Sequence, residues 1–136
     1  MIDLKQLRAD PQTARDSQAA RQADPGLVDQ VLAADEHHRA RLTGFETLRA
    51  QHKDLSRSIG KASPEDRPAV LAKAKEMAEQ VKAAEHTATQ AAAKLDALLS
   101  TFDNLVHPKA PPGGEEDFVV RSTHGRPRDF AAEGFT

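Results

Sequence analysis

The fold is decided by residues 70–105, which read VLAKAKEMAEQVKAAEHTATQAAAKLDALLSTFDNL. Eleven positions in this stretch, separated by alternating steps of four and three, are all apolar. They are Val70, Ala74, Met77, Val81, Ala84, Ala88, Ala91, Leu95, Leu98, Phe102 and Leu105. This spacing places them on one face of an α-helix, as in the seam of a coiled coil. The pattern predicts a long helix over residues 64–104, and the alanines at its centre require a partner helix that approaches closely.

The preceding stretch, residues 25–60, supplies that partner. Its seam also follows steps of three and four, although two successive steps of three interrupt the strict heptad. The seam positions are Val28, Val31, Asp35, His38, Leu42, Phe45, Leu48, His52, Leu55 and Ile59, of which three are polar. Gly60 favours a helix end, and Ser63-Pro64 a new helix start. Because the turn between them is short, the two helices are expected to lie antiparallel, each on the order of 50–60 Å long.

Shorter helices are expected before this hairpin. Asp10-Pro11 places a capping carboxylate before a proline, which has no N–H to leave unsatisfied at the start of a helix, and Asp24-Pro25 does the same at the start of the long helix over residues 25–60. Short helices are therefore expected over residues 4–22, and residues 1–104 are expected to form one domain. The predicted fold class is all-α, a long antiparallel two-helix coiled-coil hairpin with a short N-terminal helix.

The last part of the chain has a different character. Prolines and glycines make residues 105–136 an expected linker that leads to a first strand over residues 117–122. A turn is expected over residues 125–127, and Phe130 and Phe135 have too few apolar neighbours to be buried. Because one strand alone is not stable in water, this segment is interpreted as the start of a larger domain that is absent here.

Composition excludes several classes of protein. Of the 136 residues 38% are hydrophobic, but 24 are alanine, and the aromatic residues are five Phe, so there is too little apolar volume for a thick core. The chain has no Cys, which excludes disulfides and thiolate chemistry. It contains no apolar run of membrane-spanning length, and its N-terminus does not resemble a signal peptide. A cytoplasmic protein that does not enter the membrane is expected.

No catalytic or metal-binding motif is present. The six His do not form an H-E-x-x-H motif, and neither a P-loop nor a G-x-S-x-G sequence occurs. His38 and His52 fall on the predicted seam and are interpreted as structural polar residues. A two-helix rod is also expected to lack the concave pocket that an active site needs. The sequence predicts no catalytic residue, no metal site and no bound cofactor.

The charge distribution is more informative than the net charge of −2. Between Arg49 and Lys75 there are seven basic and three acidic residues, a net charge of +4 at the end of the expected hairpin. Arg49, Lys53 and Arg57 follow one another at four-residue spacing along one row of the helix. Such a row is suited to phosphate-backbone contacts, although an ordinary solvated helix face carries similar spacing. The segment lacks the interleaved aromatic residues that stack on single-stranded bases.

Motifs along the whole chain carry a resemblance to a known family. They are Met1-Ile2-Asp3-Leu4-Lys5 with Leu7-Arg8 and Pro11, Leu27-Val28-Asp29 with Asp35, Leu48-Arg49-Ala50, Ser56-Arg57-Ser58-Ile59-Gly60-Lys61, Asn104-Leu105 with His107-Pro108, Pro112-Gly113-Gly114-Glu115-Glu116-Asp117, and Gly125-Arg126-Pro127 with Phe130. In this order and spacing the chain resembles bacterial seryl-tRNA synthetase.

The resemblance implies an N-terminal tRNA-binding domain whose helical arm grips the long variable arm of serine tRNA. The parent enzyme attaches serine to tRNA through a class II catalytic domain that uses ATP and Mg²⁺ and forms a homodimer. That domain is expected to be absent here, so this chain alone is expected to be inactive. The residues implied to contact tRNA are the basic residues of the distal half: Arg49, Lys53, Arg57, Lys61, Lys73 and Lys75.

Two other interpretations remain open. The chain could be a structural hairpin that docks a protein partner or associates with itself into a four-helix bundle. It could also be a free-standing paralogue of the arm with a different RNA partner. Concentration-dependent mass without RNA affinity would favour the structural hairpin.

Overall fold

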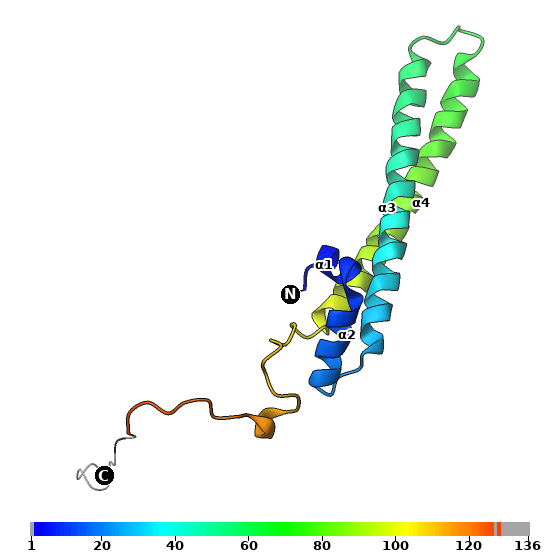
Figure 1. Ribbon diagram of the computed structural model, residues 1–136. Coiled ribbons are helices and arrows are strands. Elements are labelled where there is room, and N and C mark those ends of the chain that lie inside the picture. Colours follow the sequence, from blue (N-terminus) through cyan, green and yellow to red (C-terminus); the bar gives the residue numbers. More distant parts are fainter. Residues whose placement is uncertain (1, 127, 129–136) are drawn as a thin grey trace, which may run out of the picture.

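The computed structural model describes residues 2–126 and residue 128, and the regular elements of that part of the chain are all helical (Figure 1). Two short helices come first, two long helices follow, and one short 3₁₀-helix lies near the C-terminus. They are α1 (Leu4–Ala9), α2 (Pro11–Ala20), α3 (Gly26–Ile59), α4 (Arg67–Ser100) and η1 (Glu115–Asp117).

Helices α3 and α4 form the predicted antiparallel hairpin (Figure 1). Each contains 34 residues, which at 1.5 Å per residue gives a length of about 50 Å. All eleven predicted seam positions of residues 70–105 are buried or half-buried. On α3 the seam is equally well confirmed except at Leu42, whose exposed fraction is 38%. His38 and His52 are half-buried in this seam, as expected of structural polar residues.

Asp10 and Ser63 cap as predicted, although the helix bounds differ by a few residues. Asp24 Oδ1 accepts from the N–H of Gly26 at 2.8 Å, but α3 begins at Gly26 with Pro25 as its N-cap residue. Asp10 accepts hydrogen bonds from the backbone N–H and the hydroxyl of Thr13, and Pro11 is the first residue of α2. Ser63 Oγ accepts from the N–H of Asp66 at 3.1 Å. The intervening residues form turns, so α4 begins at Arg67 rather than at residue 64, and its helical geometry ends at Ser100 rather than at residue 104.

The hydrophobic core lies at one end of the rod, where α1 and α2 pack against the hairpin (Figure 1). We call this end the base and the opposite end, with the turn between α3 and α4, the tip. Leu7 of α1 and Ala14 of α2 are buried against Val28 and Val31 of α3, both of which have no exposed surface. The base therefore has three layers, whereas the rest of the rod has two.

The predicted strand over residues 117–122 is wrong. Asp117 belongs to η1, the following residues have no regular structure, and the side chains of Phe118, Val119 and Val120 are 66–70% exposed. The described part of the chain offers no second strand with which this segment could pair, and an unpaired strand is not stable. A turn is expected over residues 125–127, and there the chain bends at Gly125, which has a positive φ of 78°. Met1, Pro127, Phe130 and Phe135 lie outside the described residues.

The linker after α4 is held against α2. The backbone N–H of Val106 donates to Ser17 Oγ at 2.7 Å, and the N–H of Gly113 donates to the carbonyl oxygen of Ala20 at 2.8 Å. Ser17 is itself buried. These contacts fix where the chain leaves the base. In the described part of the chain no helix is long and apolar enough to cross a membrane.

Candidate nucleic-acid interface

The six basic residues implied by the sequence lie in the distal half of the hairpin, far from α1 and α2 (Figure 1). Three belong to α3, one to the turn and two to α4, and all six are exposed. They are Arg49, Lys53, Arg57, Lys61, Lys73 and Lys75. The structure therefore leaves each of them accessible to an external anion.

The seam fixes on which side of the rod these residues lie. Arg49 and Lys53 each follow a seam position of α3, and Lys75 follows the buried seam residue Ala74 of α4. In two antiparallel helices that face each other, the positions that follow the seam on both helices point to the same side. Arg49, Lys53 and Lys75 therefore share one side of the hairpin, which we call the distal basic face.

The other three residues are arranged differently. Lys73 precedes Ala74 and so lies on the opposite side of α4 from Lys75, about 200° around the helix. Arg57 lies on the outer surface of α3, and Lys61 follows Gly60 in the turn at the tip. The structure thus brings three of the six residues together on one face and distributes the others around the tip.

Few of these charges are neutralised within the chain. Among the described residues, Arg57 is the one of the six that forms an ion pair, with Asp54 at 3.3 Å, and both side chains are at least two-thirds exposed. An exposed pair of this kind contributes little to stability. The Arg49 guanidinium lies 6.0 Å from the centre of the Phe45 ring, a cation–π contact that orients it without neutralising it.

Lys82 is a further exposed cation that the charge count did not include, because it lies beyond residue 75. It follows the seam residue Val81 and therefore belongs to the same side as the distal basic face. The position after each seam residue, rather than a charge window, is the signal that identifies it. Glu46 and Glu85 also follow seam residues near it, so the positive surface ends there.

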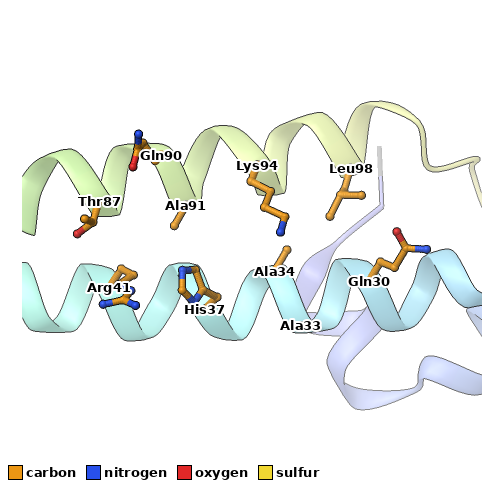
Figure 2. Close-up of a pocket in the computed structure, with 10 residues that line it drawn as sticks. All are labelled: Gln30, Ala33, Ala34, His37, Arg41, Thr87, Gln90, Ala91, Lys94 and Leu98. Atoms are coloured by element: carbon orange, nitrogen blue, oxygen red, sulfur yellow. The ribbon is translucent and has the colours of Figure 1, made fainter.

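A groove also lies between α3 and α4, nearer the base (Figure 2). Its volume is about 660 Å³, so the expectation that a two-helix rod offers no concave surface is wrong. Side chains of both helices line it, among them His37 and Arg41 from α3 and Lys94 from α4. We call it the basal groove. It contains no carboxylate, and in the described part of the chain no group of His, Cys, Asp and Glu could hold a metal ion.

Comparison with known proteins shows what the chain as a whole is similar to. The family described as the seryl-tRNA synthetase N-terminal domain matches residues 1–106. The chain is 61% identical over 136 residues to a serine–tRNA ligase of Beutenbergia cavernae, covering 100% of this chain and 32% of that protein. It is 53% identical over 131 residues to the serine–tRNA ligase of Acidothermus cellulolyticus, covering 96% of this chain and 31% of that protein. The chain spans about a third of the length of the curated relatives it matches.

Proposed function

The chain belongs to the family of seryl-tRNA synthetase N-terminal domains, and from this premise we propose that its hairpin is a tRNA-binding arm that contacts the long variable arm of serine tRNA. The observation that carries the proposal is the net charge of +4 over residues 49–75, whose charged side chains are exposed at the tip end of the rod. Three arginines near the base are paired with aspartates, whereas among the described residues one of the six basic residues of the distal half, Arg57, forms an ion pair. The distal cations are therefore available to attract phosphates.

The shape of the hairpin suits recognition of an RNA duplex. The major groove of A-form RNA is deep and narrow, so proteins recognise duplexes by their shape and through phosphates and ribose hydroxyls. A straight rod with cations on one face can follow such a backbone. Residues 45–84 contain one aromatic side chain, Phe45, and it is half-buried in the seam. Stacking on RNA bases is therefore not expected to be the main contribution to binding. Selectivity then comes from a duplex arm that most tRNAs lack.

In this proposal the chain selects and positions tRNA for an enzyme that attaches serine to it. Activation of serine with ATP and Mg²⁺, and the homodimer contact, are assigned to parts of the relatives that this chain does not span. Among the described residues no three side chains of His, Cys, Asp or Glu are grouped so that they could hold the Mg²⁺ of an ATP site. No chemical step is therefore assigned to this chain, and its tRNA partner implies a cytoplasmic location.

The test is a binding titration of the chain with serine tRNA and with the same tRNA lacking its long variable arm, at two salt concentrations. We expect tighter binding to the intact tRNA, with an affinity that falls as salt rises, because phosphate contacts release counterions. Equal binding to both RNAs, or no binding to either, would contradict the proposal.

A double variant tests the tip itself. Arg57→Ala with Lys61→Ala should weaken binding to serine tRNA about tenfold, because two phosphate contacts are lost. Helicity measured by circular dichroism should not change, since both side chains are exposed. The matched control is Lys5→Ala with Lys109→Ala, which removes the same charge from exposed positions outside the hairpin. Unaltered binding by the tip variant would refute the assignment of the tip.

The exposed Leu42 and Leu71 favour one alternative, association of the hairpin with itself or with a protein partner. This alternative predicts a mass in analytical ultracentrifugation that rises with concentration, together with no affinity for RNA. A mass that stays monomeric while tRNA binds would exclude it.

A further inference from the structure

The basal groove holds cations that have no counterion. Arg41 and Lys94 form no ion pair within the described part of the chain, and no Asp or Glu lines the groove. In the same half of the molecule Arg8, Arg15 and Arg39 are all paired with aspartates. The groove thus keeps two unpaired cations in a region where three arginines are neutralised.

The groove has room and hydrogen-bond donors for an anion. Its floor contains the methyl groups of Ala34 and Ala91, which are 7% and 5% exposed, and such short side chains leave the flank of the hairpin unfilled. Figure 2 shows the Lys94 side chain extending from α4 toward Ala34 of α3. Gln30 and Gln90 add amide groups at the two helices. Positive charge together with amide N–H groups is the donor set that binds phosphate oxygens.

The groove is longer than a single phosphate. Its α3 side extends from Gln30 to Arg41, which at 1.5 Å per residue corresponds to about 16 Å along the rod. Lys94 precedes the seam residue Leu95, whereas the residues of the distal basic face follow seam residues. The groove therefore opens on the opposite side of the hairpin from that face, and one straight stretch of backbone cannot occupy both.

We propose that the basal groove is a second phosphate-backbone site, in which His37, Arg41 and Lys94 bind a phosphodiester stretch separate from the one at the distal basic face. The inference rests on the proposed function, because it takes the same RNA as the ligand. The rod then contacts that RNA on two sides and at two positions along its length. Two such contacts fix the orientation of the rod on the RNA as well as the affinity between them.

The first test is the double variant Arg41→Gln with Lys94→Gln, whose control, Lys5→Gln with Lys109→Gln, removes the same charge elsewhere. All four side chains are exposed, so folding should be retained and circular dichroism should show it. With serine tRNA, the groove variant should bind about tenfold more weakly, and the slope of log affinity against log salt should be shallower by about one unit per lost contact. The control should bind as the unmodified chain does.

The outcomes separate the two proposals. If the unmodified chain binds tRNA and the tip variant is weakened, but the groove variant equals its control, the groove inference is overturned and the proposed function stands. If the unmodified chain does not bind tRNA, both are overturned. If both sites contact RNA independently, combining the groove and tip variants should multiply their fold-losses, because the sites share no residues.

A second measurement uses the unmodified chain. Lys94 is exposed and should react with an amine-acylating reagent in the free protein. Bound serine tRNA should slow this reaction at Lys94 and leave it unchanged at Lys109, as read by mass spectrometry of peptides. Equal reactivity of Lys94 in the free and bound protein would refute the inference.

Discussion

Asp35 shows how one buried charge attaches the N-terminal helices to the rod. Its side chain on α3 is 4% exposed and accepts hydrogen bonds from Arg8 Nη1 of α1 at 2.9 Å and from Arg39 Nε at 3.0 Å. Burial by itself raises the pKa of this carboxyl, but the hydrogen bonds from Arg8 and Arg39 outweigh it, so the pKa lies below its ordinary value of 3.8. The ionised form is therefore the one that the fold stabilises.

Replacement of Asp35 by Asn should destabilise the chain by about 1–3 kcal/mol at pH 7, because two charge-assisted hydrogen bonds weaken while Arg8 and Arg39 can still reach water. Urea unfolding followed by circular dichroism would measure the free energy of unfolding. Asp54→Asn, which removes an exposed carboxylate, is the matched control and should change it by less than about 0.5 kcal/mol. Equal effects of the two variants would contradict this role of Asp35.

The same residue gives a pH dependence with a definite sign. Because the folded-state pKa of Asp35 is lowered, its contribution is complete above its ordinary value of 3.8 and is lost as the pH falls through the lower folded-state pKa. The Asn variant should therefore lose less stability in acid than the unmodified chain. The pKa of Asp10 is also lowered, chiefly by the side-chain hydrogen bond from Thr13. The free energy of unfolding of both proteins should therefore still fall in acid.

At the scale of elements, the alanines of the α4 seam set the distance between the two helices. Ala88 is 6% exposed and faces α3. Ala88→Leu adds three carbons where the helices are already in contact, and should destabilise the hairpin by about 1–3 kcal/mol. Ala93→Leu makes the same change at an exposed position of the same helix and should have little effect. Thermal unfolding of both variants measures the difference, and similar melting temperatures would show that the helices do not pack closely here.

The elements that could be predicted from the sequence are those governed by local periodicity. The α4 seam was predicted in full because each of its apolar positions faces one partner helix, and Asp10 and Ser63 identified helix starts because capping is local. The strand around Val119 was predicted wrongly, since strand formation depends on a partner that a local pattern does not reveal. The basal groove was missed because it arises between Ala34 and Ala91, two residues 57 positions apart whose alignment depends on the relative rotation of the helices.

The candidate interface was predicted in its residues but not in its arrangement. The charge count identified the exposed cations of the distal half, including Arg49 and Lys75. It did not show that these two share a side while Lys73 lies on the other, because that requires the seams of both helices together. Lys82 was missed for the same reason.

For the whole molecule, the distribution of burial predicts a gradient of stability along the rod. Among the described residues, Ala74 is the one buried apolar residue of the distal half. The other buried apolar residues lie around the base or in the adjoining part of the hairpin. The distal half is a two-helix layer with half-buried seam residues, whereas the base adds α1 and α2 and the contacts of Asp35. Local opening requires less free energy where fewer apolar contacts are lost. The cations of the distal half that are proposed to contact RNA therefore lie in the part of the rod that opens most easily, unlike those of the basal groove.

Hydrogen exchange followed by mass spectrometry tests this gradient. Backbone amides of residues 45–59 and 67–84 should exchange faster than those of residues 28–38 and 88–100, although all four segments are helical. If the arm binds RNA through its distal half, serine tRNA should slow exchange there, since a ligand that binds the closed form stabilises it against opening. Uniform exchange along both helices would mean that the hairpin opens as one unit and would contradict the gradient. Slowing confined to the base would instead mean that the basal groove, and not the tip, makes the main RNA contact.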